Sequence, residues 1–141
     1  MSQFISTSAE ETEQFACRLA QSLKGGEVIA MYGGMGMGKT AFTRGLARGL
    51  GIVSGVSSPT FALVHEYQGR LTVYHFDMFR VTDWDDLYST GFFDYLDTDA
   101  VLVIEWSENI EQALPKDCIK IHVALGEHEN ERIFTVEGGN L

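Results

Sequence analysis

The chain alternates between two kinds of apolar pattern, and each predicts a different element of secondary structure. Apolar side chains recur every three or four positions in residues 8–23 and again in residues 40–50, which is the spacing of one helix face. The first stretch opens with the letters SAEE, which fit a capping box. Both stretches are followed by glycine, as helices commonly are. We therefore predict a helix in each.

Short runs that are apolar throughout predict buried strands. Residues 27–32 (EVIAMY) and 100–106 (AVLVIEW) are too short for helices and suit strands covered on both faces, as in a parallel sheet. Residues 61–67 and 71–76 flank a short glycine-containing turn and predict a hairpin.

The remaining segments complete the predicted architecture. Residues 118–125 and 132–138 form a second expected antiparallel pair. Residues 83–99 contain short helical pieces, and residues 108–114 predict a helix. Strands that alternate with helices and end in a hairpin predict a three-layer α/β fold with a mixed, mostly parallel central sheet. The length suits one domain over residues 1–141.

A glycine-rich segment stands between the first predicted buried strand and the second predicted helix. Residues 33–40 read GGMGMGKT, the spacing of a loop that wraps the phosphates of a nucleoside triphosphate. Backbone N–H groups of such a loop point at phosphate oxygens, and the helix N-terminus adds the positive end of its dipole. We expect Lys39 to contact the β- and γ-phosphates and the Thr40 hydroxyl to ligate Mg²⁺. The predicted fold class is accordingly P-loop NTPase-like.

The overall charge is acidic, with twenty Asp and Glu against ten Lys and Arg and a formal net charge of −10. This argues against nonspecific binding to nucleic acid or anionic membranes. At the glycine-rich loop, backbone N–H groups and Mg²⁺ would counter the negative charge of the phosphates. The distant acidic surface matters little there, because charges beyond about 8 Å are largely screened at physiological salt. No stretch approaches the ~20 apolar residues of a membrane helix, and the N-terminus lacks a signal-peptide pattern. Two widely separated cysteines fit free thiols. We expect a cytoplasmic protein.

Two acidic residues stand at the ends of predicted strands. Glu105 ends the run VLVIE, the form of a Walker B strand, and Asp77 ends VYHFD. One is expected to hold the magnesium shell and the other to orient or deprotonate the attacking water. An ordinary turn or helix-cap role stays open for each. His75 is assigned to its strand, because the four histidines lack metal-site spacing.

Three further residues are weaker candidates. Thr60 lies in an irregular segment between the phosphate helix and the next strand, where nucleotide sensors occur, although an ordinary turn threonine is the alternative. Arg44 and Arg80 are the candidate cations for the transition state, and a solvated surface position is the alternative for each.

Several segments together resemble one family. They are GGMGMGKTAFTRGLARGLG, SSPTFALVHEY, VYHFDMFR, GFFDYL and VLVIEWSE. Their order and spacing resemble the TsaE (formerly YjeE) family, small bacterial ATPases needed for threonylcarbamoyladenosine modification of tRNA. The resemblance covers essentially the whole chain. It implies Mg-ATP hydrolysis that acts on a complex of TsaB and TsaD and drives its cycle, with TsaD performing the transfer and tRNA contacted only indirectly.

The resemblance also implies residue roles. It assigns phosphate binding to Gly36, Met37, Gly38, Lys39, Thr40 and Ala41. Thr40 with Glu105 would hold Mg²⁺, and Lys39, Asp77 and Glu105 would serve hydrolysis. Thr60 would lie in a switch-like loop at the nucleotide, Trp106 beside the metal site, and the segment 8–10 near the adenine. Ala41 stands where the family usually has a second threonine, which bears on nucleotide affinity.

Two other functions remain alternatives. A small-molecule kinase would use the same loop but would need an acceptor pocket and usually an arginine-rich lid, whereas residues 81–99 are acidic. A noncatalytic, nucleotide-controlled binding module of the GTPase type would carry the guanine signature N-K-x-D, and the chain lacks it. Phosphate release with and without the partner complex separates the three.

Overall fold

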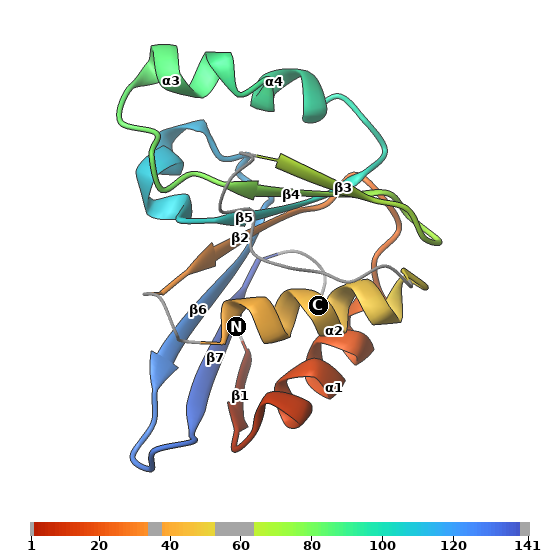
Figure 1. Ribbon diagram of the computed structural model, residues 1–141, viewed down its shortest axis with the longest axis vertical. Helices are drawn as coiled ribbons and strands as arrows, with labels where there is room; N and C mark the ends of the chain where they lie inside the picture. The colour runs from red at the N-terminus through yellow and green to blue at the C-terminus, as the bar shows by residue number, and fades with distance from the viewer. Residues whose placement is uncertain (1, 34–37, 53–63, 139–141) are drawn as a thin grey trace.

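A seven-stranded sheet forms the middle layer, with helices on both of its faces (Figure 1). The computed structural model describes residues 2–33, 38–52 and 64–138. The strands are β1 (Ser2–Ser6), β2 (Val28–Tyr32), β3 (Val64–Tyr67), β4 (Val73–Asp77), β5 (Val101–Glu105), β6 (Ile119–Leu125) and β7 (Arg132–Glu137). The helices are α1 (Ala9–Ala20), α2 (Lys39–Gly49), α3 (Trp84–Ser89), α4 (Phe92–Tyr95) and the 3-10 helix η1 (Ser107–Ala113).

The strand order is β1-β7-β6-β2-β5-β4-β3. The four central strands, β6, β2, β5 and β4, run parallel, while β3 and β7 pair antiparallel at the two sides and β1 extends the β7 side. This confirms the three-layer α/β fold with a mixed sheet and both predicted antiparallel pairs. Because these strands run parallel, the carboxyl ends of β2, β4 and β5 lie at one edge of the sheet.

Strand β1 is an element that the sequence pattern did not predict. It pairs antiparallel with β7, with Phe4 opposite Phe134. A five-residue edge strand with polar residues at both ends carries little local signal, so its conformation is set by pairing with a strand from the far end of the chain.

Helices α1 and α2 cover one face of the sheet at close range (Figure 1). A Cβ atom on Gly45 of α2 would lie 2.2 Å from the carbonyl oxygen of Glu13 on α1. Only glycine permits this approach, and an alanine there would force the helices apart. The core on this face includes Ile29, Phe42, Leu46, Val103 and Phe134, all buried.

The start of α1 differs in detail from the predicted capping box. The Ser8 hydroxyl accepts a hydrogen bond from the Glu11 N–H at 3.1 Å, as expected for the N-cap. The Glu11 carboxylate instead accepts from the backbone N–H and hydroxyl of Thr7, at 2.6 Å each. These hydrogen bonds lower the pKa of the exposed Glu11 carboxyl. The reciprocal bond is therefore displaced by one residue.

Helices α3 and α4 and the 3-10 helix η1 cover the opposite face. Phe76, Phe92, Leu102 and Ile104 are buried between them and the sheet. The helix predicted near residue 108 is thus present as η1, although in 3-10 form. Within the described ranges, no helix has the length and apolar character needed to cross a membrane, and Cys17 and Cys118 are free thiols.

Candidate functional site

The glycine-rich segment connects β2 to α2, as the sequence predicted. Strand β2 ends at Tyr32, and α2 begins at Lys39 with Gly38 as its N-cap. Gly38 adopts φ 97°, in the left-handed region where residues with a side chain are strained. It also brings no side-chain cap to the first turn, so the N–H groups there are available to a ligand. Gly36, Met37 and Thr60 lie outside the described residues.

Lys39 is buried, and its ammonium group points back toward the start of the loop. The side chain is 5% exposed; Nζ donates a hydrogen bond to the Gly33 carbonyl oxygen at 2.7 Å and lies 4.6 Å from the centre of the Trp106 ring. Besides the phosphate contact expected from the sequence, Lys39 therefore packs against the Trp106 ring. A buried ammonium held by one carbonyl and one ring face retains hydrogen-bonding capacity for an anion.

Thr40 and Ala41 complete the first turn of α2. The Thr40 side chain is half-buried, and its hydroxyl makes no hydrogen bond within the described part of the chain. The hydroxyl oxygen therefore keeps its lone pairs for a cation. Ala41 is 6% exposed and has no polar side-chain atom to offer, so only its backbone can contact a phosphate.

Asp77 and Glu105 meet at the edge of the sheet because β4 and β5 run parallel. The two residues are partners in register, and the Met78 N–H donates to the Glu105 carbonyl oxygen at 3.1 Å. Side chains on a strand alternate between faces. Since Val73 and Val103 pack in the core under α1 and α2, Asp77 and Glu105 project on the same face as α2.

Glu105 is a buried carboxylate held by a histidine. It is 5% exposed, and its Oε2 lies 2.7 Å from Nε2 of the fully buried His75. Oε1 makes no hydrogen bond within the described residues. Nδ1 of His75 is buried and has no hydrogen-bond partner among the described residues. Nε2 and Oε2 therefore bond to each other, while Nδ1 and Oε1 make no hydrogen bond there.

Sequence reasoning did not find this role for His75, which it assigned only to the strand. The usable signal was the H-x-D spacing, because alternation puts His75 and Asp77 on one face. The contact with Glu105 depends on the register between two strands that are far apart in sequence, and no local pattern encodes that register.

Asp77 has one oxygen committed to its own turn. Oδ1 accepts from the Phe79 N–H at 2.9 Å, an Asx-type contact of the kind that the sequence left open as an alternative role. Oδ2 makes no hydrogen bond among the described residues. Turn formation and a role at the edge of the sheet are therefore compatible, because they use different oxygens.

Trp106 is the residue after Glu105 and has an unusual backbone. Its φ of 60° is the one positive φ found at a described residue other than glycine, a conformation that costs roughly 1–2 kcal/mol for an L-residue. This turn aims the indole at two neighbours, with the Phe79 ring centre 4.9 Å away and Lys39 Nζ over its face. Strained residues of this kind cluster at functional sites.

A cavity of about 350 Å³ lies beside the first turn of α2. Its lining comprises Thr7, Ser8, Ala9, Thr12, Gly38, Ala41, Asn130 and Arg132. Ser8 and Ala9, from the segment that the family resemblance placed near the adenine, thus line the same cavity as Gly38 and Ala41. Asn130 and Arg132 come from the β6–β7 connection and the start of β7 and were not foreseen, since nothing in their local sequence marks them.

The oxygen donors at this edge of the sheet fit magnesium better than a metal that prefers histidine or cysteine ligands. In the described ranges no group of three His, Cys, Asp or Glu side chains is arranged to hold an ion. Magnesium prefers oxygen ligands and is commonly bound by one or two carboxylates together with waters and phosphates. Oε1 of Glu105 and the Thr40 hydroxyl, which have no hydrogen-bond partner in the part of the chain that the structure describes, match that requirement.

Within the described residues, neither candidate cation forms a hydrogen bond or ion pair with Lys39, Asp77 or Glu105. Arg44 Nε lies 3.9 Å from a Glu13 carboxylate oxygen between α1 and α2, and Arg80 is exposed. Both arrangements agree with the surface positions that the sequence left open as alternatives.

Comparison with known proteins gives a consistent result. Residues 6–134 match the family described as "Threonylcarbamoyl adenosine biosynthesis protein TsaE". Two relatives are named tRNA threonylcarbamoyladenosine biosynthesis protein TsaE. The one from Treponema pallidum is 36% identical over 92% of this chain and 96% of its own length. The one from Bacillus subtilis is 39% identical over 92% of this chain and 82% of its own length.

The fold has a similar solved structure as well. A crystal structure of YdiB from Bacillus subtilis superposes with a TM-score of 0.82 at 33% sequence identity. The match covers 99% of this chain and 86% of that one, so the sheet order and both helical layers belong to an arrangement already observed by experiment.

Proposed function

Because the chain belongs to the TsaE family of tRNA threonylcarbamoyladenosine biosynthesis proteins, we propose that it is a Mg²⁺-dependent ATPase that acts on the TsaB–TsaD complex in this modification and drives its cycle. One observation carries the proposal. The lysine that opens α2 and two strand-end carboxylates come from separate segments and share one edge and one face of the sheet.

Phosphate binding falls to the start of α2. The uncapped N–H groups of the first turn and the positive end of the helix dipole favour an anion. Lys39 exchanges its contact with the Gly33 carbonyl for the β- and γ-phosphates, a short displacement for a flexible side chain. Burial strengthens the attraction between the ammonium and the phosphates.

In this proposal the Thr40 hydroxyl and Oε1 of Glu105 would hold Mg²⁺, which would supply positive charge against the phosphate oxygens. His75 keeps Glu105 in place from the opposite side, through the 2.7 Å hydrogen bond to Oε2. A carboxylate fixed in this way needs little reorganisation when it takes up its ligand.

Asp77 orients the attacking water. Its Oδ1 is fixed by the Phe79 N–H, which leaves Oδ2 to accept a hydrogen bond from water at the edge beside Glu105. The nucleoside occupies the cavity lined by Ser8, Ala41 and Asn130, because that cavity adjoins the first turn of α2.

The partner requirement follows from the positions of the basic side chains. Of the described basic residues, Lys39 is the one that we place at the phosphates, and Arg44 is engaged by Glu13. Charge that develops in phosphoryl transfer is often met by a group supplied in trans, which contributes about 10³–10⁵ in rate. We expect TsaB and TsaD to provide that group or to order the loops that complete the site.

The test is phosphate release from Mg-ATP by the chain alone, with TsaB or TsaD singly, and with both. We expect slow release alone, strong stimulation by the complex, and none from Lys39→Met, which keeps the apolar stem of the side chain. Hydrolysis at the parental rate by the Lys39 variant would remove the site assignment. A fast rate indifferent to the partners would favour a small-molecule kinase or a free-standing ATPase.

A further inference from the structure

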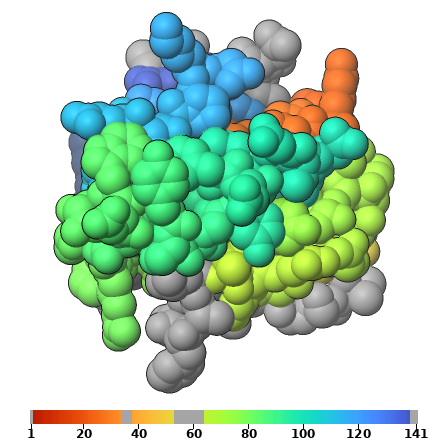
Figure 2. All heavy atoms as spheres, turned by 90° about the horizontal axis from the view of Figure 1, so that it is seen from above, coloured from red at the N-terminus to blue at the C-terminus, as the bar shows by residue number. Residues whose placement is uncertain are grey.

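Helices α3 and α4 form the outer surface on one side of the molecule (Figure 2), and large aromatic side chains on α3 and before it are exposed. Phe79 is 54% exposed, Trp84 49% and Tyr88 64%. The Tyr88 ring lies 4.9 Å from that of Phe93, and the Trp84 ring lies 6.4 Å from that of Tyr88. An exposed cluster that includes tryptophan and tyrosine is typical of a protein interface, where these residues supply much of the binding energy.

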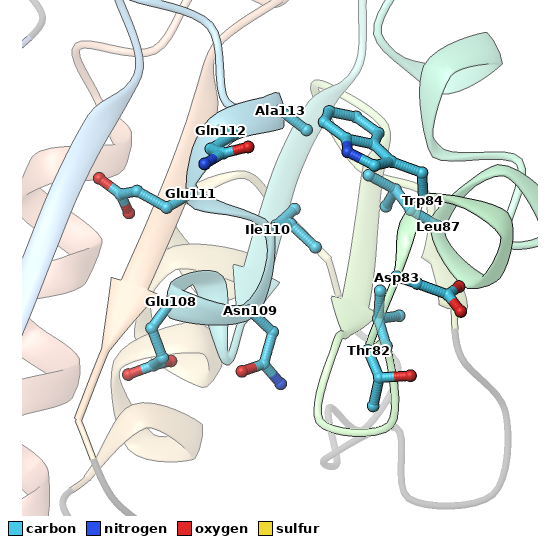
Figure 3. A pocket seen from close by; sticks show the side chains of 11 residues that line it. Thr82, Asp83, Trp84, Leu87, Glu108, Asn109, Ile110, Glu111, Gln112 and Ala113 are labelled. Atoms are coloured by element: carbon cyan, nitrogen blue, oxygen red, sulfur yellow. The ribbon is translucent and has the colours of Figure 1, made fainter.

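A groove of about 440 Å³ opens beside this cluster, between η1 and the segment that leads into α3 (Figure 3). Leu87 and Ile110 form its apolar interior, and both are buried. Figure 3 shows the Trp84 indole and Ala113 at one end and Thr82 and Asn109 at the other. We call this hollow the α3–η1 groove.

The formal charges that line the α3–η1 groove are all negative. They belong to Asp83, Glu108 and Glu111. Lys120 neutralises Glu111 from outside the groove, with Nζ 2.6 Å from Oε1. Glu108 is exposed and makes no ion pair or hydrogen bond within the described residues, so its charge is available to an incoming cation.

The α3–η1 groove continues toward the edge of the sheet where the proposed ATPase site lies. A second hollow, of about 430 Å³, is lined by Phe79 and Trp106 and shares Val81, Thr82 and Asn109 with the groove. Trp106 in turn carries Lys39 Nζ on its ring face. A segment bound along both hollows would therefore touch the residue that packs against the phosphate-binding lysine.

We propose that the α3–η1 groove docks a segment of a partner protein that places an apolar side chain on Leu87 and Ile110 and a Lys or Arg beside Glu108. The proposal rests on the proposed function, because it identifies the surface through which the partner complex stimulates hydrolysis. A second copy of this chain is a poor occupant, since each copy carries a net charge of −10. A small molecule would fill the groove but would leave Phe79 and Tyr88 exposed.

The experiment measures the affinity of the full-length chain for the TsaB–TsaD complex at one fixed salt concentration. Trp84→Ala removes the aromatic anchor, and Glu108→Lys reverses the free charge. Ile5→Ala and Asp117→Lys are matched controls outside both the groove and the nucleotide cavity. Ile5, on the edge strand β1, is 52% exposed, and Asp117, before β6, is exposed. Partner-free ATP hydrolysis is measured for every variant, because neither Trp84 nor Glu108 belongs to the proposed catalytic site.

We expect Trp84→Ala and Glu108→Lys each to weaken binding at least tenfold and to reduce stimulation, with partner-free hydrolysis unchanged and both controls within twofold of the parent. Parental affinity in both groove variants would overturn the docking surface and leave the ATPase function standing. Equal losses in the control variants would also overturn it. If the parent chain hydrolyses ATP but does not bind the TsaB–TsaD complex, the proposed partner of the groove is wrong. If it neither hydrolyses ATP nor binds the complex, the proposed function is wrong.

Discussion

At the scale of single residues, the His75–Glu105 pair determines how the carboxylate is presented. Glu105 is buried, and the one hydrogen bond to its carboxylate among the described residues comes from a ring that is itself fully buried. Loss of the ring nitrogen would leave a buried carboxylate without its donor, which is costly and frees the side chain to change rotamer. The histidine therefore acts through Glu105 and does not touch the nucleotide.

We predict that His75→Leu weakens the Mg²⁺ dependence of nucleotide binding by about 10–100-fold, the range typical when the support of a metal ligand is lost. His75→Gln should retain much of the parental behaviour, because its amide nitrogen can donate to the same oxygen. The measurement is a Mg²⁺ titration of the binding of a fluorescent ADP analogue, with binding in excess chelator as the second readout.

His65→Leu is the control, since His65 is the register partner of His75 on β3 and is not in contact with Glu105. A purely structural role for His75 would weaken binding equally with and without Mg²⁺. That result, or an unchanged Mg²⁺ titration in His75→Leu, would contradict the assignment.

At the scale of elements, a polar cluster ties the end of β2 to η1 and β6. The Tyr32 hydroxyl donates to the Glu111 carboxylate, and Lys120 Nζ reaches the same group at 2.6 Å. The hydrogen bonds from Lys120 and Tyr32 lower the pKa of Glu111, and the bond with Glu111 raises that of Lys120. Burial, followed by the hydrogen bond to Glu111, raises the pKa of Tyr32 above its ordinary value. The carboxylate thus links the strand before the phosphate loop to two neighbouring elements.

We predict that Glu111→Gln lowers the free energy of unfolding at pH 7 and lowers it less at pH 3. The folded pKa of Glu111 lies below its unfolded value, so the stabilisation is present above the unfolded pKa and is lost as the pH falls through the folded one. Urea unfolding at the two pH values measures this. Glu108→Gln, which alters an exposed carboxylate on the same helix, should leave the free energy of unfolding unchanged at both pH values. Equal effects of the two substitutions would contradict the stabilising role of the Glu111 carboxylate.

At the scale of the whole molecule, the elements with strong local sequence patterns could be predicted. Those that depend on contacts with residues far away in the sequence were missed. The buried strands β2 and β5 and the amphipathic helix α2 could be predicted, as could Lys39, Asp77 and Glu105, since each follows from a motif or a strand end. Strand β1 was missed because its signal is its pairing with β7. His75 and Asn130 were missed for the same reason, because their neighbours are distant in sequence.

The last prediction concerns a ligand that would span the molecule. The proposed site draws on the segment before α1, the start of α2, the ends of β4 and β5, and the β6–β7 connection. A ligand that binds only the folded chain stabilises it by about 2.7 kcal/mol at a hundred times its Kd. We therefore expect a nonhydrolysable ATP analogue with Mg²⁺ to raise the thermal unfolding temperature, and inorganic triphosphate with Mg²⁺ to raise it less, because triphosphate leaves the cavity empty.

Asn130→Ala should reduce the shift in unfolding temperature with the analogue and leave the shift with triphosphate unchanged. Glu129→Ala, in the same connection but outside the cavity lining, should alter neither shift. Equal shifts from the analogue and from triphosphate in the parent would place the nucleoside outside this cavity, while the absence of any shift at saturating concentrations would argue against nucleotide binding itself.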